Sequence, residues 1–341
     1  MVRLIFIVRR LGFGLIQLLT LAPIVFFLIR LLPADPVSRL VGLNPTPDSY
    51  QAARHALGLD QPLLVQLGNY IGVLGTPGLL QGNLGVSWST GEPVLIDIGR
   101  TLPVTIELIT LSFLCAFIVS FPIGMLCATR PESLADRATF MFGLFAGSQP
   151  EFWWGVLFIY VFFYVLNVAP PPLGRLNPLL HPPAVVTGFI TVDSILAWNG
   201  HALLDGLHHL MLPVATKVFV LSGPIIKMVR QNMLRVLGSD FMLYAESCGL
   251  SRGILARYAL RNALPAALTL IGVLYGYVLG GAVLIETIFS LDGIGQYAVN
   301  AVLNLDYPAI QGVVLVITAV SLLVYLMLDV AQAAIDPRVA D

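Results

Sequence analysis

Residues 240–265 read DFMLYAESCGLSRGILARYALRNALP and lie between two long apolar segments. This stretch is rich in charge, although only 11% of the residues of the whole chain are charged. Its charged residues are Asp240, Glu246, Arg252, Arg257 and Arg261. Gly249 and Pro265 are typical of helix ends, so the pattern predicts two short helices, 241–248 and 252–264, joined by a turn. Because such charge suits water or a protein partner better than lipid, we interpret 240–265 as a cytoplasmic docking loop.

The composition is that of a membrane protein. The 341 residues are 57% hydrophobic, with a mean hydropathy of +0.87, whereas a soluble domain is roughly 25% charged. The net charge of -1 leaves no basic surplus for nucleic acid. Cys115, Cys127 and Cys248 have no CxxC spacing and are interpreted as small core residues. We therefore expect an all-α, polytopic membrane protein in contact with lipid.

Six segments approach the length of about 20 apolar residues that a membrane-spanning helix needs. They are 11–31, 102–128, 138–168, 209–227, 266–286 and 309–329. If the N-terminus is inside, twelve basic residues near the span ends are cytoplasmic and five are outside. We therefore expect both termini, and the 240–265 stretch, in the cytoplasm. A seventh candidate, 184–198, has only fifteen residues and contains Asp193, so it is predicted to be an interfacial or lid helix.

The chain divides into three predicted parts. They are an N-terminal tail and first span (1–32), a periplasmic loop with short helices (33–101) and a core with five spans (102–341), which includes the coupling loop 236–265. Within the periplasmic loop, Thr46 before Pro47 predicts a helix start and Gly58 its stop. The Gly-rich residues 75–91 predict turns and close contacts.

Glycines in the fifth span predict a helix-packing face. Gly272, Gly276 and Gly280 recur every four residues and so share one side of a helix, where another backbone can approach closely. Prolines also fall in or beside the spans, where neighbouring helices can satisfy the freed backbone groups.

Familiar enzymatic motifs are missing from the chain. A nucleotide-binding GxxxxGK[ST] loop requires a Gly-Lys step, but Lys217 and Lys227 follow Thr216 and Ile226. HExxH, GxSxG and GxGxxG are missing too. We predict no catalytic residue, no metal site and no cofactor on this chain.

Ionisable residues inside spans are costly and are therefore candidates for a transport pathway. Lys217 either lines such a pathway or pairs with Glu151. Glu107 and Glu286 either bind a substrate amine or hold helices together. The sequence leaves these alternatives open.

At several points the chain resembles a known family. The 240–265 stretch resembles the "EAA" loop of ATP-binding-cassette importer permeases, and the whole chain is similar to the B-type permease of the dipeptide, oligopeptide and nickel importer family. The matching segments are LLPADPVSRL (31–40), LGLDQPLLVQ (57–66), GNLGVSWSTGEPV (82–94), TLPVTIEL (101–108), ALRNALP (259–265), ETIFSLDGIGQ (286–296), DYPAIQG (306–312) and DPR (336–338).

This resemblance implies a type I importer fold in a bacterial inner membrane. It implies a homologous C-type permease, two ATPase subunits that bind ATP and Mg²⁺, and a periplasmic or lipid-anchored solute-binding protein as partners. It also implies coupling to the ATPase through Tyr244, Ala245, Glu246, Ser247, Cys248, Gly249, Leu250 and Arg252. Peptides are the expected cargo, and a nickel chelate or another small solute is the alternative.

Four positions depart from the family pattern. Glu246 stands where relatives commonly have a basic residue, Leu291 and Asp292 stand where Trp-Pro is usual, and Glu151 occupies a position that is more often neutral. The ATPase surface that receives Glu246 is therefore expected to differ as well.

A different class of function is an ion-coupled secondary transporter with Glu107, Glu151 and Glu286 as a proton relay. It predicts transport by this chain alone, but the sequence has no pair of matching interrupted segments of the kind that inverted repeats produce. A purely structural membrane protein is a third alternative.

Overall fold

The structure is a computed structural model that describes the backbone of residues 2–42 and 46–335. Side chains are described within these ranges except at 2–6, 252, 263–268, 271 and 333–335. The described residues form helices joined by turns and loops, with an isolated bridge between Val86 and Pro93. The prediction of an all-α protein is confirmed. The chain forms two compact units, Met1–Leu102 with Gly293–Leu326, and Pro103–Asp292 with Met327–Asp341.

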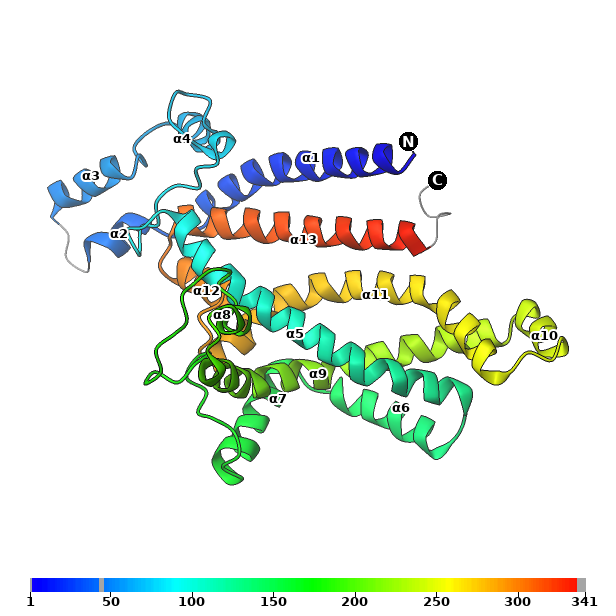
Figure 1. Cartoon of the computed structure of the whole chain (residues 1–341). Helices are drawn as coiled ribbons and strands as arrows, with labels where there is room; N and C mark the ends of the chain where they lie inside the picture. The colour runs from blue at the N-terminus through cyan, green and yellow to red at the C-terminus, as the bar shows by residue number, and fades with distance from the viewer. Residues whose placement is uncertain (1, 43–45, 336–341) are drawn as a thin grey trace. The chain divides into compact units, whose positions relative to one another are not determined.

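The first unit is built around helices from both ends of the chain (Figure 1). Its elements are α1 (Val2–Arg30), α2 (Pro36–Val41), α3 (Pro47–Ala56), α4 (Leu63–Ile71), η1 (Leu79–Gln81), the start of α5 (Val94–Thr129), α12 (Ile294–Leu303) and most of α13 (Tyr307–Ile335). Val25 and Ile29 of α1 pack on Tyr307 of α13. A second cluster joins Val94 of α5 to Ala309 of α13, so distant segments share one core.

Caps define the short helices that follow α1. The Asp35 carboxylate accepts a hydrogen bond from Val37 N at 3.0 Å, with Pro36 at the first helical position of α2. Thr46 Oγ1 accepts from Ser49 N at 3.2 Å and starts α3. This is the start that the sequence predicts, and α3 ends at Ala56, two residues before Gly58.

The Gly-rich segment adopts conformations that favour glycine. Gly75, Gly82, Gly85 and Gly91 have positive φ angles, which residues with a Cβ rarely adopt. At Gly78 a Cβ would lie 2.6 Å from the Tyr70 carbonyl oxygen. The predicted turns and close contacts are therefore confirmed.

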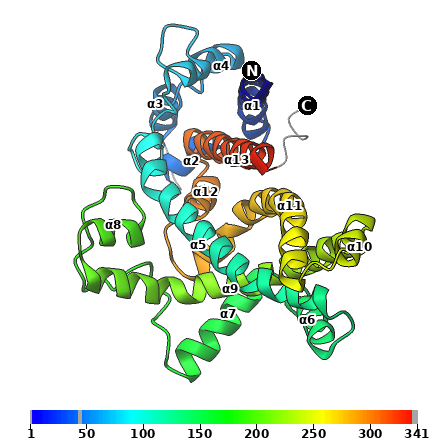
Figure 2. The ribbon, with the colours of Figure 1, turned by 45° about the vertical axis from the view of Figure 1, so that its right-hand side comes forward.

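The second unit is organised around α9 (Gly200–Leu237), as Figure 2 shows. Its other elements are the rest of α5, α6 (Leu134–Ala146), α7 (Glu151–Phe158), the π-helical turn η2 (Ile159–Val165), α8 (Ile190–Leu196), α10 (Asp240–Ser247), α11 (Arg252–Ile288) and the end of α13. Helices α6, α7, α8, α10 and α11 all contact α9. The core joins Leu108 of α5, Leu212 of α9 and Ile285 of α11.

Glycines let two helices approach α9 closely. A Cβ built at Gly223 would lie 3.1 Å from Gly143 Cα of α6, and one at Gly124 of α5 would lie 2.8 Å from Val229 Cβ. These glycines were not among those predicted to form a packing face. At Gly280, which was predicted to do so, a Cβ would have no neighbour within 4 Å, so the packing role of Gly272, Gly276 and Gly280 stays a prediction.

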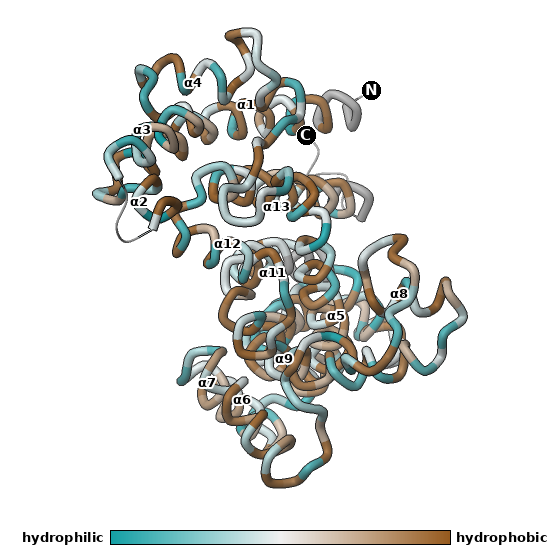
Figure 3. The backbone as a smooth tube through the Cα atoms, turned by 90° about the vertical axis from the view of Figure 1, so that its left-hand side faces the viewer, coloured by the Kyte–Doolittle hydropathy of each residue, from teal (hydrophilic) through white to brown (hydrophobic). Residues whose placement is uncertain are grey.

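Four helices of the described residues are long and apolar enough to cross a membrane. They are Ile7–Arg30, Val94–Thr129, Gly200–Leu237 and Tyr307–Gln332, and the shorter apolar helices are Glu151–Val165 and Gly272–Ile288. Figure 3 shows apolar residues along the long helices and polar stretches in the connection that holds α2 and α3. The prediction of a polytopic membrane protein is confirmed.

Three predicted boundaries are wrong. The segment 138–168 is not one helix, because α6 ends at Ala146 and α7 begins after Pro150; a proline disfavours helical backbone at the residue before it. Pro265 does not end a helix, since α11 runs through it to Ile288. The lid helix is only Ile190–Leu196, because residues 186–188 form a loop that donates hydrogen bonds to Asp193.

The close approach of α6 and α9 gives a stability prediction. Gly223→Leu should destabilise the purified chain in detergent by about 1–3 kcal/mol, because the new side chain meets the α6 backbone. Gly280→Leu is the matched control, with open space at its Cβ. Thermal unfolding of both variants tests this prediction, and equal melting temperatures would contradict it.

Candidate functional site

The segment between α9 and α11 is an exposed helical hairpin. Helix α10 spans Asp240–Ser247, and Gly249 N donates to Glu246 O at 2.9 Å in the turn that follows. Gly249 has φ +76°, a conformation that strains any residue with a Cβ. The predicted helix and turn are confirmed, whereas the predicted helix 252–264 is the first part of α11.

Helix α10 has one anchored face and one open face. Met242 and Ala245 are buried, in a helix that packs against α9 and α11 (Figure 2). On the other side Tyr244 is 73% exposed, and the other exposed residues are Asp240, Phe241, Leu243, Glu246, Ser247 and Cys248. The prediction of Cys248 as a core residue is therefore wrong. A short helix that presents exposed apolar groups to its surroundings is suited to a groove on another protein.

Glu246 is an exposed acidic residue in the last turn of α10, and Asp240 is another in the first turn. Among the side chains that the structure describes, none forms an ion pair with Glu246, so its carboxylate is available to a partner. The side chain of Arg252, another residue of the expected coupling set, lies outside the described side chains, and Leu250 is half-buried.

Lys217 and Glu151 form an ion pair inside the second unit. Lys217 Nζ of α9 lies 2.9 Å from Glu151 Oε1, and the lysine side chain is fully buried. Glu151 is the first residue of α7, where the helix dipole also favours a negative charge. Of the two interpretations that the sequence left open, these contacts favour pairing.

Glu107 of α5 holds the N-terminus of α8. Its carboxylate accepts hydrogen bonds from Ile190 N at 3.1 Å, Thr191 N at 2.8 Å and Thr191 Oγ1 at 2.6 Å. Arg175 adds an ion pair at 3.1 Å. Sequence reasoning missed Arg175, because its loop gives no signal of which span it meets.

Glu286 of α11 is fully buried and accepts a hydrogen bond from the Thr105 hydroxyl of α5. The four pathway candidates thus take part in separate contacts that join α5 to α8, α7 to α9 and α5 to α11. Holding helices together is the role that these contacts favour for Glu107 and Glu286.

Two further carboxylates stabilise connections that the sequence analysis did not assign. Arg230 of α9 binds Asp136 of α6 through both carboxylate oxygens at 2.5 and 2.7 Å, and these hydrogen bonds lower the pKa of Asp136. Burial alone would raise the pKa of Asp193, but hydrogen bonds from Thr187, Gly188 and Val186 outweigh it and lower the pKa.

In the first unit, Asp306 connects two of the family-like segments. Its Oδ2 accepts from Ser87 Oγ at 2.6 Å, Ser89 Oγ at 2.6 Å and Ser89 N at 3.0 Å, and its Oδ1 accepts from Ala309 N at 3.2 Å. The segments at 82–94 and 306–312 therefore meet in space through one buried carboxylate.

Two family profiles match the chain. The family described as "Binding-protein-dependent transport system inner membrane component" matches residues 120–341. A second, "Binding-prot-dependent transport system membrane comp, N-term", matches residues 1–109.

Individual relatives match almost end to end. A probable D,D-dipeptide transport system permease of Escherichia coli K12 is 36% identical over 98% of this chain and 97% of its own length. A di/tripeptide transport system permease of Pseudomonas aeruginosa UCBPP-PA14 is also 36% identical, over 98% of both chains. The dipeptide transport system permease of Escherichia coli K12 is 32% identical over 98% of both chains.

The Lys217–Glu151 pair makes a testable prediction. Lys217→Met should cost about 1–3 kcal/mol of unfolding free energy, because it leaves the partly buried Glu151 carboxylate without its counterion. The double variant Lys217→Met, Glu151→Met should recover much of this loss. Lys227→Met, on the exposed side of the same helix, is the control. Denaturant titration in detergent gives the double-mutant cycle, and additive losses would contradict the pairing.

Proposed function

This chain belongs to the family of inner-membrane components of binding-protein-dependent transport systems, and from that premise we propose that it is the B-type permease of an ATP-driven peptide importer. As a permease subunit of this family it has no catalytic activity and no cofactor of its own, and the ATPase is a separate component of the system. It is a multi-pass protein of the inner membrane.

Short peptides are the proposed cargo. The relatives described above are permeases for D,D-dipeptides, for di- and tripeptides and for dipeptides. Their matches cover 97–98% of their own lengths, so no separate cargo-specific domain distinguishes them from this chain. This full-length similarity supports the same class of solute.

We further propose six membrane crossings with both termini in the cytoplasm. The four long apolar helices supply four crossings, and Glu151–Val165 and the apolar part of α11 supply the other two. This assignment keeps twelve of the basic residues near the span ends on the cytoplasmic side and five outside. The three sequence-based parts, 1–32, 33–101 and 102–341, are retained in this arrangement as tail with first span, periplasmic loop and core.

We propose that α10 and the turn at Gly249 are the part of this chain that the ATPase contacts and displaces during ATP hydrolysis. This helix lies between α9 and α11 and contacts both, and those helices carry Lys217 and Glu286. A displacement of α10 by an ATPase groove would therefore move both helices and bias the bundle between inward- and outward-facing states. The open face of α10 is the observation that carries the proposal.

The partners follow from this proposal. A solute-binding protein delivers the peptide from outside, a homologous C-type permease completes the pathway, and two ATPases each receive one coupling segment. Gly272, Gly276 and Gly280 are proposed to pack against the second permease, since the position of Gly280 is open within this chain.

Uptake in reconstituted vesicles tests the function. The complete complex with its binding protein should accumulate a labelled dipeptide only when ATP and the ATPases are present. Excess unlabelled nickel chelate should not compete. Uptake driven by a proton gradient without ATPases would overturn the proposal in favour of a secondary transporter.

The coupling role of α10 gives a second prediction. Glu246→Arg should lower cargo-stimulated ATP hydrolysis about tenfold, which corresponds to about 1.4 kcal/mol of docking free energy. The exposed Glu132, in the turn between α5 and α6, provides Glu132→Arg as a control with the same charge change. Both variants should assemble normally, and equal ATPase rates would contradict the coupling role.

A further inference from the structure

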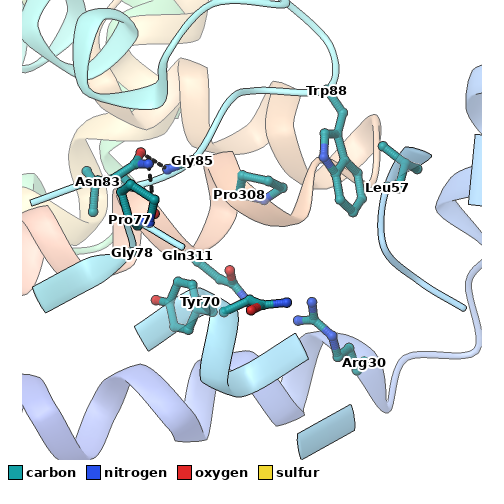
Figure 4. Close-up of a pocket in the computed structure, with 12 residues that line it drawn as sticks. Arg30, Leu57, Tyr70, Pro77, Gly78, Asn83, Gly85, Trp88, Pro308 and Gln311 are labelled. Atoms are coloured by element: carbon teal, nitrogen blue, oxygen red, sulfur yellow. Dashed lines mark hydrogen bonds between the residues drawn. The ribbon is translucent and has the colours of Figure 1, made fainter. Parts of the chain in front are cut away.

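The first unit contains a polar pocket that the proposed transport function does not use. It has a volume of about 190 Å³ and is lined by residues from α1, α4, the Gly-rich segment and α13. Figure 4 shows the Arg30 and Gln311 side chains directed into this space from α1 and α13, whereas the Tyr70 ring of α4 lines it with its hydroxyl turned away from Arg30. The volume is enough for a small organic group.

Arg30 places a positive charge at the pocket without an acidic partner. Its guanidinium lies 3.6 Å above the Phe26 ring, and Nε donates to Gln66 Oε1 at 2.9 Å. Nη1 donates to Phe26 O at 3.4 Å. Among the described residues, no carboxylate forms an ion pair with Arg30, and none accepts a hydrogen bond from its Nη2.

A further polar group at the pocket is buried without a partner. The Gln311 side chain is 3% exposed, and its Nε2 makes no hydrogen bond within the described residues. In Figure 4 this amide lies between the Tyr70 ring and the Arg30 guanidinium.

Leaving a cation and a buried amide donor without a partner is unfavourable unless a ligand satisfies them. A guanidinium and an amide N–H are both donors to a single acceptor group with negative charge. The planar guanidinium is suited to the two oxygens of a carboxylate. The space has aromatic and apolar sides, because Trp88 and Pro308 also line it.

We propose that this pocket binds a carboxylate group, with Arg30 as its counterion and Gln311 Nε2 as a further donor. The carboxylate belongs either to a small solute, such as the C-terminus of a peptide, or to an acidic side chain of the solute-binding protein. The naming of these two sources rests on the proposed function, whereas the carboxylate site itself does not.

The test uses the intact transporter complex in detergent at constant ionic strength, with sodium acetate as the probe. Acetate should raise the melting temperature saturably, by about 3 °C at tenfold excess over half-saturation. Acetamide, its neutral analogue of similar shape, should have no effect. Arg30→Met should abolish the response to acetate.

Gln311→Glu provides a second variant that keeps the stack of Arg30 on Phe26. The new carboxylate occupies the pocket itself, so this variant should melt higher than the native complex and respond no further to acetate. A native complex that responds equally to acetate and acetamide, responds to neither, or prefers phosphate overturns the proposal. Acetate stabilisation that persists in Gln311→Glu overturns it as well.

Two further experiments identify the source of the carboxylate. If the source is a peptide, glycylglycine but not its C-terminal amide should reproduce the acetate response. If the source is the binding protein, acetate should weaken the binding of that protein to the native complex. Because the acetate arm needs neither transport nor cargo, failure of the pocket and failure of the proposed importer are distinguishable.

Discussion

The folded chain depends on the need of buried carboxylates for hydrogen-bond donors. Glu107 and Asp306 are each almost completely buried, and an ionised carboxylate in such a place is stable only when donors surround it. Each therefore fixes an irregular segment: Glu107 holds the start of α8, and Asp306 holds residues 87–89. These two buried carboxylates thus determine where the start of α8 and the loop at residues 87–89 lie.

The sequence predicts the features that depend on neighbouring residues. The all-α class follows from long apolar runs, α3 follows from Thr46 and Pro47, and the turn after α10 follows from Gly249. The broken third segment was missed because a hydropathy window averages over the four residues between α6 and α7. The long α11 was missed because a proline inside a membrane-type helix does not act as a stop.

The parts of the site that the sequence could not predict are those made by distant residues. Arg175 meets Glu107 across 68 positions, and Asp136 meets Arg230 across 94. The pocket combines Arg30, Tyr70 and Gln311, each unremarkable in its own segment. Glu246 and Gly249, in contrast, lie in one short stretch whose composition already distinguishes it, so the candidate coupling segment could be identified from sequence alone.

The two-sided construction of α10 has a consequence for how such permeases diverge. The face with Met242 and Ala245 secures the helix to its own chain, whereas the face with Tyr244 and Glu246 contributes little to the internal packing. Substitutions on the open face can therefore accumulate without loss of the folded state. On the coupling role that we propose for α10, a duplicated importer in the same cell would in this way acquire an ATPase of its own, and the chemistry of a single helix face would reduce cross-talk between the two systems.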